Sequence, residues 1–268
     1  MSYSKIPVII LGGGYTGKVI YHQALNLNRP IFITSRSPEL HLQDFPKNER
    51  IWFDLEMEQS WGNIPEYGDA IWTFPARPLD QVKKFIVEKR NNFRRLVVIG
   101  STSSYIIESA NEAASVDENS PVNMKDARVA GEEFLRRTLN AVILRSAGIY
   151  GPGRNPLDWI RKGRLKYFSK VLNLIHVEDL SSICLLALEK GTWAETYNIS
   201  DGFPRLVSEL IEKARFKWNK PIPHFSADLK TEKKVLNQKM IQHFNYILKF
   251  PDLFIALDKM DETISIDP

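Results

Sequence analysis

Three glycines near the start of the chain have the spacing that a dinucleotide-binding turn requires. Gly12, Gly14 and Gly17 form the pattern G-x-G-x-x-G between an apolar run and an amphipathic segment. Gly12 permits a tight turn, Gly14 lets the backbone approach a pyrophosphate, and Gly17 lets the following helix pack closely on the strand. The amide groups at the start of that helix, at Tyr15 and Thr16, suit an anion. The pattern predicts a dinucleotide site, and a glycine turn without a ligand is the alternative.

The end of the second expected strand indicates which dinucleotide would bind. In a site for NAD(H), a carboxylate about 20 residues after the glycines binds the 2′-hydroxyl of the ribose. Here the sequence is Thr34-Ser35-Arg36 and contains no carboxylate. Arg36 can pair with a 2′-phosphate and Ser35 can donate a hydrogen bond, whereas an acidic side chain would repel that phosphate. We therefore expect NADP(H) as the preferred cofactor and NAD(H) as the second choice. The alternative is that Arg36 only caps a loop toward solvent.

Short apolar segments alternate with amphipathic ones through the first two thirds of the chain, and these elements must position the glycine turn. Near-continuous apolar runs such as LVVIG suit strands that are buried on both faces. Strands that alternate with helices predict an α/β protein with a doubly wound parallel sheet, a Rossmann fold. The expected strands are 7–12, 30–34, 51–53, 70–74, 95–100 and 141–145, and the expected helices are 15–28, 78–92 and 124–139.

The composition of the sequence changes after residue 148, where a Gly- and Pro-rich segment is followed by basic residues. This change predicts two domains that share the chain, with a smaller C-terminal α/β lobe for the substrate. The expected bounds are 1–148 with 176–200 for the dinucleotide-binding Rossmann domain, and 149–175 with 201–268 for the substrate lobe. Helical patterns are expected in that lobe at 207–218 and 231–244.

Composition excludes several classes of function. The chain has 36 Lys and Arg against 32 Asp and Glu, and its net charge of +4 is scattered, so no nucleic-acid partner is expected. No apolar stretch approaches the ~18 residues of a membrane span, and the start of the chain lacks the pattern of a signal peptide. The five histidines lack metal-ligand spacing and the single cysteine, Cys184, lies in an apolar segment. We expect a cytoplasmic protein without a membrane or metal site, in which Cys184 is buried and inert.

Several segments spread over nearly the whole chain carry a recognisable pattern. They are LGGGYTGKVI, ITSRSPE, FDLE, VVIGSTSSY, RVAGEEFLRR, VILRSAGIYGPGRNPLDWIRKG, LIHVEDL and YNISDG. Together they resemble the short-chain dehydrogenase/reductase superfamily, and in particular an atypical branch of its NAD-dependent epimerase/dehydratase group. The resemblance implies the Rossmann fold and an NAD(P)-dependent oxidoreductase, and it does not specify a substrate.

The resemblance also implies cofactor contacts at matching positions. Asp54, just after the third expected strand, matches the position that contacts the adenine, and the alternative is that it caps a loop. Pro75 and Ala76, after the fourth expected strand, match the segment that passes the ribose and the phosphates. Tyr150, with the Gly-Pro that follows it, matches a segment beside the nicotinamide.

Three further matches concern catalysis and the substrate. Ser101 matches the catalytic Ser or Thr of the family, and the alternative is a strand-end hydroxyl bonded to the backbone. His176 and Asp179 match a turn that lines the substrate cleft. The alternative is that they begin an ordinary helix, with Asp179 as its capping carboxylate.

The chain departs from the family at the acid–base pair, which is Tyr-x-x-x-Lys on one helix. That spacing puts both side chains on one face, where the lysine lowers the pKa of the tyrosine and holds the ribose. When Glu132 is aligned with the glutamate that usually follows the lysine by four, the lysine position holds Arg128 and the tyrosine position holds Met124. Methionine has no proton to give, and arginine can donate to a ribose but does not titrate in a useful range. We therefore expect Arg128 to bind the cofactor without serving acid–base chemistry.

Three residues were considered as substitutes for that pair. Lys125 is one residue away from the required position and would face about 100° away. An alignment shift that made Lys125 the lysine would put Pro121 at the tyrosine position. Tyr105 belongs to a structural element of the family, although Ile106 follows it here instead of glycine. His176 can titrate near neutral pH and is the preferred candidate.

These observations leave two functional hypotheses and a third in which the protein binds no cofactor. The favoured hypothesis is an NADP(H)-dependent, epimerase/dehydratase-like oxidoreductase that acts on a nucleotide-sugar or similar polar small molecule, with Ser101 and His176 as catalytic candidates. The second is a non-catalytic NADP(H)-binding redox sensor or regulatory protein, which Met124 and Arg128 favour directly. The third is a relic of the fold that binds nothing. A monomer or a homodimer is expected, and the sequence does not decide between them.

Overall fold

The computed structural model describes residues 6–107, 114–165, 167–218 and 233–264. The chain divides into two compact units. Unit 1 consists of 1–104, 122–145 and 180–197, and unit 2 consists of 105–121, 146–179 and 198–268. Residues 105–121, which the sequence analysis kept with the Rossmann domain, are part of unit 2 in this division. No helix among the described residues is long and apolar enough to cross a membrane.

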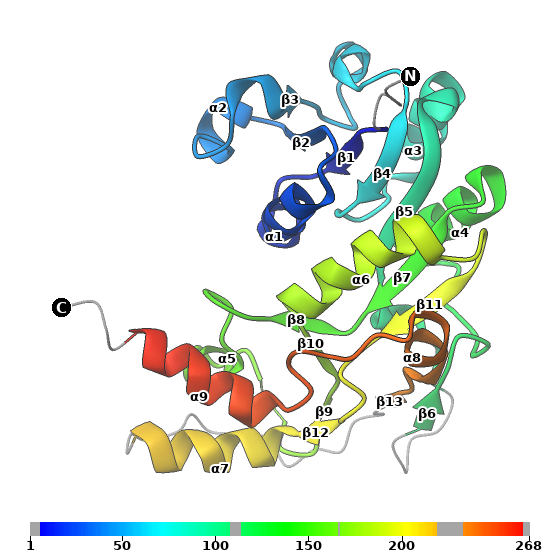
Figure 1. Ribbon diagram of the computed structural model, residues 1–268. Helices are drawn as coiled ribbons and strands as arrows, with labels where there is room; N and C mark the ends of the chain where they lie inside the picture. The colour runs from blue at the N-terminus through cyan, green and yellow to red at the C-terminus, as the bar shows by residue number, and fades with distance from the viewer. Residues whose placement is uncertain (1–5, 108–113, 166, 219–232, 265–268) are drawn as a thin grey trace. The chain divides into compact units, whose positions relative to one another are not determined.

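A seven-stranded sheet organises the chain, in the order β11-β7-β5-β4-β1-β2-β3 (Figure 1). The strands from β5 to β3 in this order pair in parallel. Their bounds are β1 (Val8–Leu11), β2 (Ile31–Ser35), β3 (Arg50–Trp52), β4 (Gly68–Trp72), β5 (Phe93–Ser101), β7 (Val142–Ser146) and β11 (Thr196–Ile199). The chain runs from β1 outward to β3 and then returns to β4 on the other side of β1. In such doubly wound sheets the ligand binds beyond the carboxyl ends of the strands at this reversal.

All six predicted strands are present, with ends that differ from the predicted ends by at most two residues. The predicted fold class, an α/β protein with a doubly wound sheet, is confirmed. The strand β11 was not predicted. Its residues are fully buried but number only four, which is too short for the apolar pattern to distinguish a strand from a buried loop.

Helices cover the sheet in unit 1. They are α1 (Tyr15–Ala24), α2 (Pro38–His41), α3 (Leu79–Lys89), α4 (Ala127–Leu139) and α6 (Val177–Lys190), and short 3₁₀ turns lie at Leu25–Leu27, Lys47–Glu49, Glu58–Asn63, Arg90–Asn92 and Thr102–Ser104. On one face of the sheet, Ile9 and Trp72 pack with Phe85 of α3 and Leu135 of α4. The single cysteine, Cys184 in α6, is fully buried as predicted, and burial raises the pKa of its thiol.

The start of α4 corrects an expectation about the acid–base positions. The helix expected from 124 begins at Ala127 instead, because the Asp126 side chain accepts a hydrogen bond from Arg128 N (2.9 Å) and caps the helix there. Met124 and Lys125 lie in the turn before the helix, and both are exposed. The prediction that Met124 and Arg128 share one face of one helix is therefore wrong.

The described residues of unit 2 form three two-stranded sheets and helices around a second core. Its strands are β6 (Ala114–Val116), β8 (Gly148–Tyr150), β9 (Val171–Leu172), β10 (Leu174–His176), β12 (Arg205–Leu206) and β13 (Lys233–Val235), and its helices are α5 (Pro156–Arg161), α7 (Val207–Trp218), α8 (Gln238–Phe244) and α9 (Leu253–Ile264). The pairs are β8 with β10 and β6 with β13 in parallel, and β9 with β12 antiparallel. The helix predicted at 207–218 is confirmed as α7. The helix predicted at 231–244 is wrong in its first half, because β13 precedes α8; residues 231–232 lie outside the described residues.

Candidate functional site

The glycine turn lies between β1 and α1, as its spacing predicted. Gly12 has a φ of +106°, and a Cβ there would lie 2.5 Å from Thr73 Oγ1. A Cβ on Gly17 would overlap the carbonyl oxygen of Gly12, so glycine permits the close packing of α1 on the turn. A Cβ on Gly14 would meet no protein atom within 4 Å. The protein itself therefore requires glycine at two of these positions, and the third has an open side.

Side chains of the neighbouring strands hold this turn in place. Thr34 Oγ1 in β2 accepts a hydrogen bond from Gly12 N (2.8 Å), and Thr73 Oγ1 after β4 donates to Gly12 O (2.7 Å). The helix α1 has Gly14 as its N-cap and no side-chain cap. The positive end of the α1 helix dipole is therefore at the glycine turn, which suits an anion there.

A cavity of about 960 Å³ opens at the glycine turn, at the carboxyl ends of β1, β2 and β4. Seven of the eleven predicted cofactor residues line it: Gly12, Gly14, Tyr15, Ser35, Arg36, Asp54 and Pro75. The other four, Thr16, Gly17, Ala76 and Arg128, are not among its lining residues. Thr16 is buried in α1, and Ala76 is buried where a Cβ on Gly131 of α4 would overlap its carbonyl oxygen.

The cavity also has lining residues that the sequence analysis missed. They include Lys18, His41 and Arg77, together with Leu40, Phe53, Glu56 and Phe74. Lys18 follows Gly14 by one helical turn, a spacing that could have identified it. His41 belongs to the four-residue helix α2, and its Nδ1 lies 3.0 Å from Ser35 Oγ. No periodic pattern marks so short a helix, so the sequence offered no signal for His41.

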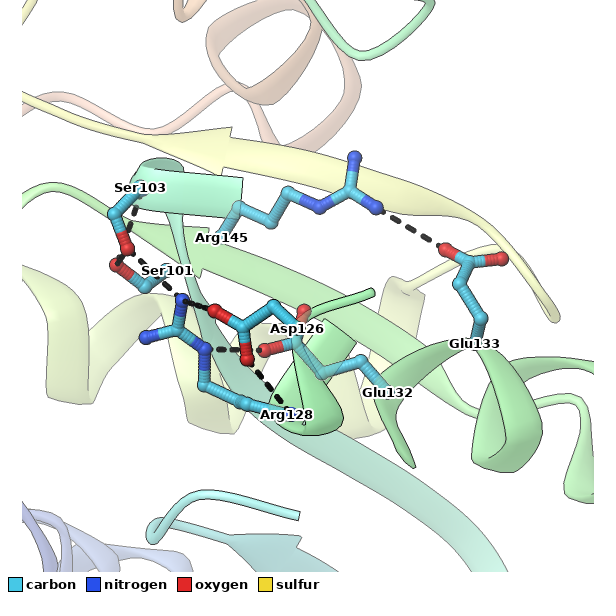
Figure 2. Close-up of polar contacts among 7 residues, drawn as sticks. All are labelled: Ser101, Ser103, Asp126, Arg128, Glu132, Glu133 and Arg145. Carbon is cyan, nitrogen blue, oxygen red and sulfur yellow. Dashed lines mark hydrogen bonds and ion pairs between the residues drawn. The ribbon is translucent and has the colours of Figure 1, made fainter. Parts of the chain in front are cut away.

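A network of polar side chains lies where β5 ends and α4 begins (Figure 2). Ser101 Oγ is 3.1 Å from Ser103 Oγ and accepts a hydrogen bond from Ser103 N (3.2 Å). Arg128 Nη2 donates to Ser103 Oγ (2.9 Å) and lies 3.3 Å from Asp126 Oδ2. The structure therefore joins Ser101, the predicted catalytic serine, to Arg128 through one intervening hydroxyl group.

Glu132, in α4, is a further member of this network and lies beside Arg128. Its side chain is fully buried, and Oε1 lies 3.5 Å from Arg128 Nε. Neither of its carboxylate oxygens receives a hydrogen bond from the described residues. Burial raises the pKa of Glu132 to about 7, although Arg128 and Arg145 favour its ionised form. The carboxylate lies against Gly100, where a Cβ would be 2.7 Å from Oε2.

The residues predicted for the substrate cleft lie in unit 2 and are buried. The His176 ring stacks on Phe250 with a centroid separation of 3.6 Å, and only 1% of the residue is exposed. Burial lowers the pKa of His176 to about 4, so at neutral pH the ring is uncharged. Asp179 accepts hydrogen bonds from Tyr246 Oη (2.8 Å), Lys249 N (2.8 Å) and Phe250 N (3.0 Å). These contacts fasten residues 246–250 to the start of α6.

The two other candidates to replace the acid–base pair are Tyr105 and Lys125, and they lie in different surroundings. Tyr105 is buried in unit 2, and its hydroxyl donates to Asn198 Oδ1 (2.6 Å). Lys125 is exposed in the turn before α4. Tyr150, in β8, is fully buried edge-on to His176. Within the described parts of the chain, no group of three or more His, Cys, Asp or Glu side chains is placed to hold a metal ion.

Unit 2 has a cavity of its own, of about 360 Å³, beside α5. Three cationic side chains, Arg154, Lys162 and Arg164, line it together with the indole of Trp159. Asp158 is the one acidic residue among its described lining residues. This excess of positive charge suits a phosphate or another anionic group.

Comparisons with known proteins concern the fold. No protein-family model matches the sequence, and no curated protein matches it. A conserved protein of unknown function from Silicibacter pomeroyi is 22% identical, with a TM-score of 0.77 over 97% of this chain and 99% of that one. A short-chain dehydrogenase/reductase superfamily protein from Agrobacterium tumefaciens, solved with bound NAD, is 13% identical, with a TM-score of 0.77 over 97% of each chain. A dTDP-glucose 4,6-dehydratase from Bacillus anthracis, in complex with NAD, is 15% identical, with a TM-score of 0.74 over 98% of this chain and 97% of that one.

Proposed function

We propose that this chain, which has the fold of the short-chain dehydrogenase/reductases of the NAD-dependent epimerase/dehydratase group, is an NADP(H)-dependent oxidoreductase that acts on a nucleotide-sugar or a similar polar metabolite. One observation carries the proposal. The 960 Å³ cavity joins the glycine turn to Arg36 at the carboxyl ends of the central strands. That is the place where a doubly wound sheet binds a dinucleotide.

The cavity fits a dinucleotide at both of its ends. At the glycine turn, the open side of Gly14 leaves room for a pyrophosphate, and the start of α1 presents the positive end of its helix dipole to it. At the end of β2, Arg36 and the Ser35–His41 pair offer donors where a carboxylate would be expected for NAD(H). These donors favour a 2′-phosphate and so support NADP(H) over NAD(H). When bound, the nicotinamide exchanges a hydride with the substrate.

Ser101 is the proposed catalytic residue of this chain. It ends β5, which runs parallel to β4, so it lies on the same edge of the sheet as the glycine turn. A serine hydroxyl can donate a hydrogen bond to a substrate oxygen and polarise a carbonyl group. His176 was predicted to share this task, but its burial and low pKa favour a structural role in unit 2. We therefore propose Ser101 as the donor without His176.

The cationic cavity of unit 2 supports a substrate that carries phosphate groups. Arg154, Lys162 and Arg164 can pair with the phosphates of a nucleotide-sugar, and Trp159 offers a flat surface for a ring. The proposed experiment is a titration with a nucleoside diphosphate sugar such as UDP-glucose. Binding that is lost in Arg154→Ala and Arg164→Ala supports this substrate class, and binding that persists in both variants contradicts it.

The cofactor proposal is tested by fluorescence titration with NADPH and NADH. We expect the wild type to bind NADPH at least tenfold more tightly than NADH. The variant Arg36→Ala should lose this preference while retaining NADH binding, because only the 2′-phosphate contact is removed. Arg137→Ala is the matched control, since this exposed arginine of α4 lies outside the cavity and should leave both affinities unchanged. Equal affinity of the wild type for both cofactors would contradict the NADP(H) proposal.

A second candidate function is a non-catalytic NADP(H)-binding sensor or regulatory protein. The specific observation behind it is the loss of the acid–base pair: Met124 lies outside α4, and Arg128 is bonded to Ser103 and Asp126. This candidate predicts cofactor binding without oxidation of NADPH on any nucleotide-sugar or carbonyl compound tested. NADPH oxidation that depends on a substrate and is lost in Ser101→Ala would exclude it.

A further inference from the structure

We infer that Arg128 is a positioning residue for Ser101, acting through Ser103, and that it does not bind the dinucleotide. The family resemblance gives this position to a ribose ligand. In this chain its guanidinium group instead contacts Ser103 and Asp126, as Figure 2 shows. Only the use of Ser101 in catalysis rests on the proposed function, because the contact network is a property of the fold.

The guanidinium group of Arg128 is engaged on several sides. Nη2 donates to Ser103 Oγ (2.9 Å) and pairs with Asp126 Oδ2 (3.3 Å), and Nε faces Glu132 Oε1 at 3.5 Å. About a fifth of the side chain (22%) is exposed. Arg128 is also absent from the residues that line the dinucleotide cavity. A contact with a ribose through Nη2 or Nε would require that nitrogen to leave these partners.

Glu132 is a further partner of Arg128 in this network. Its buried carboxylate receives no hydrogen bond from the described residues, so Arg128 Nε is its nearest ion-pair partner. The positive charge of Arg145 in β7 also favours the ionised form of Glu132. However, Arg145 Nη2 donates its hydrogen bond to Glu133 Oε1 (3.1 Å). Removing Arg128 from the network would take away the nearest positive charge that favours the ionised form of this buried carboxyl group.

The direction of the hydrogen bonds follows from the donor and acceptor capacity of each group. Arginine can only donate, so Ser103 Oγ accepts from Arg128 Nη2. Either hydroxyl group could donate in the contact between Ser103 Oγ and Ser101 Oγ, but a hydroxyl that accepts from a cation becomes a better donor, which favours donation by Ser103. Ser101 Oγ also accepts from Ser103 N, and its two acceptor sites are then filled.

The consequence is that the hydroxyl proton of Ser101 is directed away from the network. Ser101 can then act only as a hydrogen-bond donor, which is what a substrate carbonyl or alkoxide oxygen requires. Arg128 and Ser103 thus orient this hydroxyl group without touching the substrate. Arg128, which stands at the lysine position of the family pattern, thus orients Ser101 through Ser103.

The experiment measures backbone amide exchange at Ser103 by NMR at fixed pH, together with the dissociation constant of NADPH. The Ser103 amide donates to Ser101 Oγ, so its exchange rate reports the order of this turn. In Arg128→Met we expect the exchange rate to rise at least tenfold while NADPH affinity changes less than twofold. Arg128→Lys should restore part of the protection. Arg137→Met, an exposed arginine of the same helix, is the control and should change neither quantity.

The ribose-ligand alternative predicts the opposite result. If Arg128→Met weakens NADPH binding tenfold or more, the inference is overturned, whatever happens to the exchange rate. Unchanged exchange at Ser103 would overturn it as well. Should Arg128→Met not fold, Ser103→Ala breaks the same link by removing one hydroxyl group, and the same faster exchange is expected. If the wild type binds no NADPH, the proposed function fails, and the exchange measurements still decide the role of Arg128.

Discussion

At the residue scale, Gly12 and Gly14 occupy one turn, but a methyl group at each position would meet different surroundings. At Gly12 it would clash with Thr73, and the φ of +106° disfavours any other residue. At Gly14 it would meet no protein atom, and the φ of −79° is ordinary. The first glycine is thus required for folding, and the second leaves space beside the cavity.

This difference predicts opposite phenotypes for two alanine variants. Gly12→Ala should lower the free energy of unfolding by about 1–3 kcal/mol, because of backbone strain and the clash with Thr73. Gly14→Ala should change stability by less than about 0.5 kcal/mol but weaken NADPH binding at least tenfold. Urea unfolding and fluorescence titration of both variants measure these effects. Normal NADPH affinity in Gly14→Ala would show that no ligand approaches this turn.

Glu132 predicts a pH dependence of stability. Its pKa is about 7 in the folded chain against an ordinary value of 4.5, so the folded state keeps a proton that the unfolded state has released. Its contribution is therefore fully present below pH 4.5 and is lost as the pH rises through 7. At pH 8 the full difference in pKa corresponds to about 3 kcal/mol.

The variant Glu132→Gln removes this contribution and nearly keeps the shape of the side chain. Between pH 5 and pH 8, the free energy of unfolding of the wild type should fall by about 2 kcal/mol more than that of the variant. His176, with its lowered pKa, acts in the opposite direction, but it is present in both proteins and cancels. Urea unfolding at the two pH values measures the difference. Parallel pH profiles would contradict a neutral-range pKa for Glu132.

At the element scale, the sequence predicted those elements whose residues carry a periodic pattern. The central strands are near-continuous apolar runs and were located to within two residues. The start of α4 was placed too early, because the capping bond of Asp126 to Arg128 N is a local contact that hydrophobic periodicity does not register. The strand β13 was read as helix, because three residues have no distinguishable period and their pairing partner β6 lies more than a hundred residues away.

The same limit applies to the candidate site. The residues of the glycine turn follow from spacing alone, whereas His41 reaches the cavity through a four-residue helix. The bond between Arg128 and Ser103 depends on how α4 packs beside β5, which no local pattern specifies. The G-x-G-x-x-G motif therefore predicted the glycine turn, whereas the residues around it could be identified only from the folded structure.

Asp179 gives a prediction at this scale, since its carboxylate holds an entire segment. It accepts three hydrogen bonds from residues 246–250 while fully buried. Asp179→Ala removes all three hydrogen bonds to a buried carboxylate and should lower the free energy of unfolding by about 3 kcal/mol or more. Tyr246→Phe removes one of the three bonds and should cost about 1 kcal/mol. If urea unfolding gives both variants the same loss, Asp179 does not anchor the segment.

At the scale of the whole molecule, the two units share regular elements. The divisions at 145/146, 179/180 and 197/198 fall inside β7, α6 and β11 respectively. When one unit unfolds, a strand or helix that belongs to both units loses backbone hydrogen bonds. This loss also destabilises the other unit. Although each unit has its own core, we therefore expect neither to unfold without the other.

Scanning calorimetry with NADPH tests this expectation and the cofactor site together. The chain should unfold in one transition, and NADPH at ~100 times its dissociation constant should add roughly 2.7 kcal/mol to the free energy of unfolding. For a chain of this size, that corresponds to a rise in Tm of about 5 °C. The variant Arg36→Ala, at the same NADPH concentration, should show a smaller rise, because its site is less occupied. Two transitions, of which NADPH moves only one, would show that the shared strands and helix do not couple the units.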